Sequence, residues 1–128
     1  MSIFIQENDM KIEKFEDVKA WQIARELVRE IYRITNDKEF VKDFGLKDQI
    51  RRAAVSVMSN ISEGFERGSD KEFNQFLYYA RGSSAEVKSQ LYVALDLVYI
   101  TENEFKDLYN KCTDISRLIM GFINYLKK

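Results

Sequence analysis

The stretch LKDQIRRAAVSVMSNISEGFER, residues 46–67, decides the fold. Its apolar and small side chains recur every three or four residues, which is the period of an amphipathic helix. They form one stripe: Leu46, Ile50, Ala53, Ala54, Val57, Ile61, Gly64 and Phe65. We therefore expect a helix over residues 46–67 that buries this stripe against other helices and breaks at Gly68.

Three further segments have the same period. We expect a helix over residues 17–36, another over residues 70–99 whose core stripe includes Leu95 and Val98, and a last one from about residue 102 onward. Ser69 and Thr101 precede the last two and are each followed three positions later by a glutamate, which predicts helix-capping boxes. The charged stretch 37–45 lacks periodicity and predicts a loop.

Four helices with mostly short connections pack economically as an all-α, antiparallel up-down-up-down four-helix bundle. We assign residues 15–128 to this bundle domain and residues 1–14 to an N-terminal arm. The arm is expected to be mobile, or to dock on a neighbouring subunit through Ile3, Phe4 and Ile5.

Composition excludes most enzyme chemistry. The 128-residue chain has no histidine, no proline and one cysteine, Cys112, so it cannot build a Ser-His-Asp triad or a Cys/His zinc site. We predict a protein that is not an enzyme, with no catalytic residue, metal, cofactor or small-molecule ligand.

A single cysteine allows no internal disulfide, which favours the cytoplasm, and no apolar run is long enough for a membrane span. Basic and acidic residues nearly balance, 20 against 21.

Two helix surfaces remain after the core is assigned, and both are candidate oligomer interfaces. The first is a polar ribbon on the second helix, with a glutamate on the third: Gln49, Arg52, Ser56, Asn60, Glu63, Arg67 and Glu86. The alternative for this ribbon is an ordinary solvated helix face with incidental ion pairs. The second is a row at heptad spacing along the third helix, Tyr78, Tyr92 and Tyr99, whose alternative role is to cover the edge of the bundle core.

From Phe15 onward the chain resembles the bacterial four-helix bundle proteins encoded within intervening sequences of 23S rRNA genes. The segments that carry the resemblance are FGLKDQIRRAAVSV (44–57), SNISEGF (59–65) and ARGSSAE (80–86). The resemblance implies a subunit without known enzymatic activity that assembles into a ring, a homopentamer in members of similar fold.

The chain also looks like the accessory subunit of diversity-generating retroelements, a related bundle whose basic ring engages nucleic acid and a reverse transcriptase. This similarity implies an alternative function, in which an assembled ring presents Lys47, Arg51 and Arg52 to RNA or DNA. The balanced charge of the present chain departs from that relative.

Overall fold

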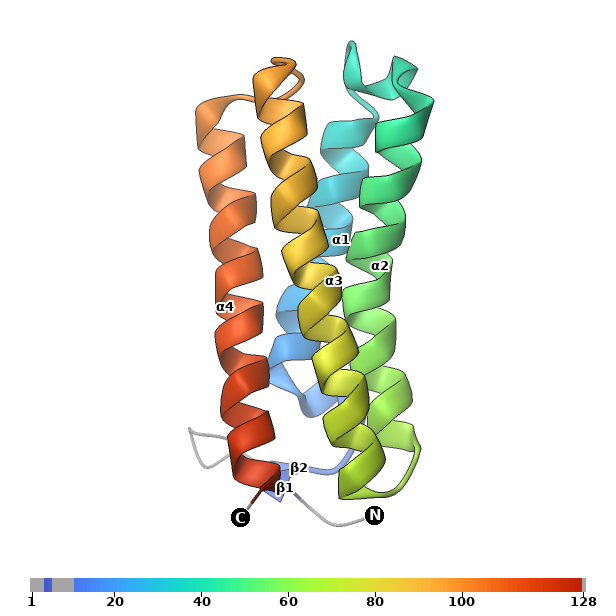
Figure 1. Cartoon of the computed structure of the whole chain (residues 1–128), viewed down its shortest axis with the longest axis vertical. Helices are drawn as coiled ribbons and strands as arrows, with labels where there is room; N and C mark the ends of the chain where they lie inside the picture. The colour runs from blue at the N-terminus through green and yellow to red at the C-terminus, as the bar shows by residue number, and fades with distance from the viewer. Residues whose placement is uncertain (1–3, 6–10, 128) are drawn as a thin grey trace.

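The computed structural model describes residues 4–5 and 11–127 and is an antiparallel four-helix bundle (Figure 1). Its helices are α1 (Lys19–Thr35), α2 (Phe44–Glu66), α3 (Asp70–Asp96) and α4 (Glu102–Leu126). Each helix packs against the next and α4 closes against α1, so that α1 and α3 lie diagonally across the bundle. The predicted four-helix bundle is confirmed. Among the described residues, no helix is long and apolar enough to cross a membrane.

The bundle core follows the helical periodicity of the sequence. In α2 the expected stripe is buried from Ile50 to Phe65, while Leu46 at its start is only partly buried. The close approach of α2 and α3 depends on Gly64, because a Cβ atom placed there would lie 2.5 Å from the Cβ of Phe76. The predicted capping residues Ser69 and Thr101 both accept a backbone N–H at the start of the helix that follows them. The Ser69 hydroxyl accepts the Glu72 N–H at 3.2 Å, and Thr101 and Glu104 make a complete capping box.

The connection between α3 and α4 differs from the sequence expectation. Helix α3 ends at Asp96 rather than Tyr99, because Val98 adopts a left-handed conformation with φ of 60°. The Val98 N–H donates to the Leu95 carbonyl at 3.0 Å and the Tyr99 N–H donates to the Ala94 carbonyl at 2.9 Å, which is a Schellman ending. Val98 is 82% exposed, so its assignment to the core stripe is wrong.

The connection between α1 and α2 is more ordered than a plain loop. Its 3-10 helix η2 (Phe40–Lys42) buries the Phe40 side chain completely, and α2 begins at Phe44. The Asp43 carboxylate caps α2 by accepting the Leu46 N–H at 3.1 Å. Phe40 lies against Tyr99, with ring centroids 5.0 Å apart, so this connection closes one end of the core.

At the N-terminus, strands β1 (Phe4–Ile5) and β2 (Lys11–Ile12) pair antiparallel, with Phe4 opposite Ile12, and the 3-10 helix η1 (Phe15–Asp17) leads into α1. Ile12 is fully buried in the core. Ile3 and the side chains of Phe4 and Ile5 lie outside what the structure describes. The expectation that they contact a neighbouring subunit therefore stays a prediction.

Candidate interaction site

The middle of the α2 ribbon is hydrogen-bonded within the subunit. The hydroxyls of Ser56 and Ser83 lie 2.9 Å apart and link α2 to α3. The Asn60 amide donates to the Ser56 carbonyl at 2.8 Å and to the Ser56 hydroxyl at 2.9 Å. These partly buried groups therefore have partners before any second copy arrives.

The ends of the ribbon are solvated. Arg67 pairs with Glu63 at 3.0 Å and lies 3.7 Å from Glu72, and all three side chains are about half exposed. Ion pairs at this exposure contribute only about 0 to 1 kcal/mol. At the other end Gln49 and Arg52 are exposed, and Arg52 forms no ion pair with any residue in the described ranges.

Glu86 lies on the α3 side of the same seam. It is exposed and accepts a long hydrogen bond of 3.4 Å from the Gln90 amide. Gln90 is 8% exposed, and its Oε1 atom has no hydrogen-bond partner in the part of the chain that the structure describes. Five of the ribbon residues thus have partners within one chain: Ser56, Asn60, Glu63, Arg67 and Glu86. That the ribbon is an oligomer interface stays a prediction.

The tyrosine row is shorter than expected. Tyr78 and Tyr92 are exposed on α3, by 40% and 51%. Tyr99 is not part of this row, because α3 ends at Asp96 and the chain changes direction before Tyr99. The Tyr99 hydroxyl instead donates a hydrogen bond to Asp43 Oδ2 at 3.0 Å. The hydrogen bond to this carboxylate, together with burial, raises the pKa of Tyr99. Tyr99 is therefore a structural residue within the subunit.

The remaining outer surface of α3 is mostly uncharged. We call it the tyrosine face; its uncharged residues, all exposed, are Gln75, Tyr78, Tyr79, Gly82, Ala85, Ser89, Tyr92 and Val93. Glu86, seven residues from both Tyr79 and Val93, is exposed on the same side of the helix. A Cβ atom placed at Gly82 would meet no heavy atom within 4 Å, so the space above this glycine is open.

The three basic residues proposed from sequence do not form one cluster. Lys47 is partly buried, with its ammonium 4.8 Å from the Phe44 ring centroid. Arg51 turns toward α1, where its Nε donates to Thr35 Oγ1 at 2.8 Å. Arg52 is the next residue along the helix, rotated by roughly 100°, and is exposed elsewhere.

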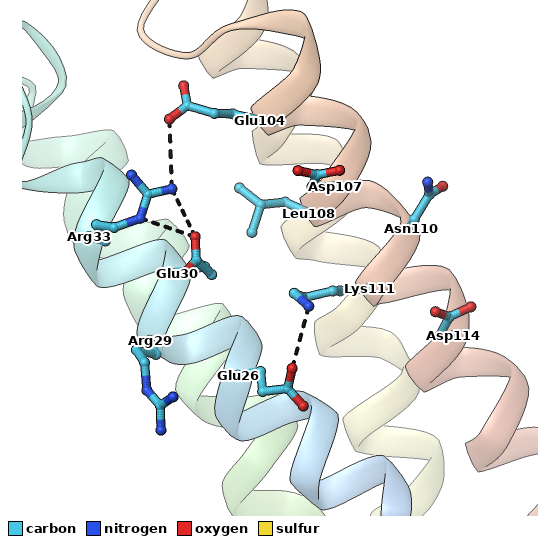
Figure 2. Close-up of a pocket in the computed structure, with 10 residues that line it drawn as sticks. All are labelled: Glu26, Arg29, Glu30, Arg33, Glu104, Asp107, Leu108, Asn110, Lys111 and Asp114. Atoms are coloured by element: carbon cyan, nitrogen blue, oxygen red, sulfur yellow. Dashed lines mark hydrogen bonds and ion pairs between the residues drawn. The ribbon is translucent and has the colours of Figure 1, made fainter.

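A groove of about 480 Å³ lies between α1 and α4 (Figure 2). Its lining residues are mostly charged: Glu26, Arg29, Glu30, Arg33, Glu104, Asp107, Leu108, Asn110, Lys111 and Asp114. Arg33 bridges Glu30 at 2.8 Å and Glu104 at 3.8 Å, and Lys111 lies 3.5 Å from Glu26. The Arg33–Glu104 and Lys111–Glu26 pairs connect α1 and α4 at the protein surface. Arg29, at the rim, points away from α4 (Figure 2).

Cys112 is buried in the core of α4. Burial raises the pKa of its thiol to about 11, so the reactive thiolate is scarce at neutral pH. Residues 4–5 and 11–127 hold no cluster of potential metal ligands.

The fold and these surfaces define a small helical bundle protein with candidate interaction faces. The family model of the 23S rRNA-intervening sequence protein matches residues 16–121, and the chain belongs to this family. A crystal structure from Bacteroides thetaiotaomicron VPI-5482, described as a protein with unknown function from the S23 ribosomal protein family, is similar in fold. It has a TM-score of 0.74 and 24% sequence identity, over 82% of this chain and 95% of that one. No curated protein matches the chain.

Proposed function

We propose that this chain is a non-catalytic protein that assembles with copies of itself through the tyrosine face of α3. The observation that carries the proposal is the group of large apolar side chains exposed on this face, Tyr78, Tyr79 and Val93, each 40 to 49% exposed, with one charged residue, Glu86, among them. A helix that stays in water normally carries charged side chains opposite its apolar stripe. The cores of protein interfaces, by contrast, are depleted of charge and enriched in tyrosine.

The other outer faces of the bundle provide the comparison. Helix α1 exposes Arg25 and Arg29 to solvent, and α4 exposes Lys106, Asp114 and Arg117. The outer surfaces of these two helices are therefore more strongly charged than the tyrosine face. The contrast within one subunit supports α3 as the contact surface.

Gly82 lies near the middle of the tyrosine face. A glycine inside a helix costs roughly 1 kcal/mol relative to alanine, and no atom of residues 4–5 and 11–127 lies close enough to make use of the missing side chain. A helix of a second copy could approach closely over Gly82 and bury Tyr78 and Tyr92 on either side. The family resemblance implies a ring of five subunits, and we adopt that size for the assembly.

The absence of catalysis is part of the same proposal. It is supported by the buried state of Cys112, the single cysteine, and by the mutual pairing of charged groups in the α1–α4 groove.

Light scattering coupled to size-exclusion chromatography tests the assembly. The wild-type protein should have a mass several times 15.2 kDa at micromolar concentration. Ala85→Glu places a charge at the centre of the tyrosine face and should lower the mass toward that of one subunit, with helical circular dichroism unchanged. Asn110→Glu is the matched control, because it adds the same charge to an exposed position on α4.

Two results would contradict the proposal. A wild-type protein that elutes as a clean monomer would remove self-assembly altogether. If Arg52→Ala lowers the mass whereas Ala85→Glu does not, the interface lies on the α2 ribbon instead of the tyrosine face.

A further inference from the structure

The glutamates of α1 and two of its arginines lie on different sides of the helix. Its two glutamates, Glu26 and Glu30, lie toward α4, where Glu26 pairs with Lys111 and Glu30 pairs with Arg33 (Figure 2). Arg25 and Arg29 lie one turn apart on the other side of the helix, and both are exposed. The overall charge of −1 hides this separation.

Helix α2 adds a third guanidinium to the same side. Arg51 donates to Thr35 Oγ1 at 2.8 Å and to Asn36 Oδ1 at 3.3 Å, and its guanidinium lies 4.4 Å from the Tyr32 ring centroid. These partners anchor Arg51 beside α1 without neutralising it, because all of them are uncharged. We call Arg25, Arg29 and Arg51 the arginine stripe.

The positive charge of the stripe is not cancelled within the subunit. No carboxylate in the described part of the chain forms an ion pair with any of its three arginines, whereas Arg33 and Arg67 are paired. Along α1 the stripe extends from Arg25 to Tyr32, because the Arg51 guanidinium lies over the Tyr32 ring. At a rise of about 1.5 Å per residue, the length of this segment is roughly 10 Å. The stripe is therefore a short line of charge on an open surface.

We infer that the arginine stripe binds the sugar–phosphate backbone of a nucleic acid. A guanidinium presents a planar fork of donors that matches phosphate oxygens, and such charge-assisted hydrogen bonds are about twice as strong as neutral ones. A line of cations without a cavity fits a chain of repeated phosphates better than one small anion. The aromatic neighbours distinguish this surface from one suited to an acidic protein, since Tyr32 is 42% exposed and offers a ring edge to a base or sugar.

This surface differs from the cluster expected from sequence. Of Lys47, Arg51 and Arg52, only Arg51 belongs to it, and Arg25 and Arg29 replace the other two. Two of its arginines, Arg25 and Arg29, lie on α1, diagonally across the bundle from α3, and Arg51 lies on the side of α2 that contacts α1. Nucleic-acid binding and assembly through the tyrosine face are therefore independent proposals with separate readouts.

Fluorescence anisotropy with a labelled RNA hairpin and a labelled DNA duplex, each over a salt series, tests the inference. The test variant is Arg25→Gln with Arg29→Gln, which leaves the anchored Arg51 in place. The matched control is Lys106→Gln with Arg117→Gln, which removes the same charge from exposed positions on α4. Light scattering on each variant should return the wild-type mass, which separates this test from the assembly proposal.

We expect wild-type protein to bind at least one of the two nucleic acids at low salt. The stripe variant should bind roughly tenfold more weakly, and its slope of log affinity against log salt should fall by about two, one for each lost phosphate contact. The control should bind like wild type. The inference is overturned if wild-type protein does not bind, if the two double variants lose affinity equally, or if polyglutamate displaces the nucleic acid as effectively as unlabelled RNA does.

Discussion

Gly64 is the position where a single added methyl group should do most damage to the bundle. In Gly64→Ala the new Cβ would lie 2.5 Å from Phe76 Cβ and 3.2 Å from both Phe76 Cγ and Phe73 Cδ1. Ordinary contact begins at 3.4 Å, so α2 and α3 must separate locally by about 0.9 Å. Because Phe76 Cβ is bonded directly to the backbone, no side-chain rotation can relieve the closest contact.

The expected effect is the difference between two opposing terms. Overpacking a dense core costs roughly 1 to 3 kcal/mol, and two simultaneous contacts on α3 place Gly64→Ala in the upper half of that range. Replacing glycine by alanine inside a helix returns about 1 kcal/mol. We therefore expect the free energy of unfolding to fall by about 1 to 2 kcal/mol.

Urea unfolding followed by circular dichroism measures this change, at two protein concentrations because the proposed assembly would add concentration-dependent stability. Gly45→Ala is the control: it is the same substitution in α2, away from the tyrosine face, and its Cβ would meet Asp43 Oδ1 at 3.9 Å, an ordinary contact distance. The subunit should gain roughly 0.5 to 1 kcal/mol from that change. The reasoning fails if Gly64→Ala is as stable as wild type, or if both substitutions shift stability in the same direction.

Three further substitutions or conditions test other features of the subunit. Val98→Gly should raise the thermal midpoint by a few degrees, because it relieves a left-handed β-branched residue at a cost of about 1 to 2 kcal/mol, whereas Val93→Gly within α3 should lower it. Arg51→Ala should reduce the urea midpoint by an amount equivalent to about 1 kcal/mol, since it removes the hydrogen bond to buried Thr35. Burial raises the pKa of Cys112 from 9.0 to about 11, so the thiol of the unfolded chain loses its proton at a lower pH than the thiol of the folded chain. The free energy of unfolding should therefore fall between pH 9 and about pH 11, and this fall should be smaller in Cys112→Ser.

The helices could be predicted from sequence because each helix repeats the same pattern of apolar positions several times. Each buried stripe offers five or more positions at the helical period, and an error at one position leaves the pattern intact. The starts of α3 and α4 were also readable, since a capping side chain such as Thr101 acts within its own turn, whereas α1 begins at Lys19 and α2 at Phe44 rather than at the expected residues 17 and 46. Local chemistry decided these elements, so a single sequence contained what was needed.

The connections could not be predicted in the same way. The end of α3 is marked by Val98 in a position that glycine usually occupies, so the sequence carries no stop signal there. Phe40 is fully buried amid charged neighbours, and only contact with Tyr99 from a distant part of the chain explains its burial. In both places tertiary packing outweighs local preference.

The candidate surfaces show the same division. The exposure of Tyr78 and Tyr92 followed from heptad spacing on one helix, and was predictable. The orientation of Arg51 depends on Thr35 and on how α1 packs against α2, which no local pattern reveals. The arginine stripe was missed for this reason, although the spacing of four between Arg25 and Arg29 was a signal for part of it.

The two proposed surfaces reinforce each other if both operate. A line of three guanidinium groups on one subunit is a weak ligand for a phosphate backbone, and salt at physiological strength would reduce its affinity further. Assembly through α3 leaves α1 unobstructed, because the two helices lie diagonally across the bundle, and it repeats the stripe once in every subunit. Repeated binding sites on one particle raise overall affinity without any new contact, provided that the nucleic acid can reach more than one of them. A nearly neutral subunit could in this way bind a polyanion that its own net charge gives no reason to expect.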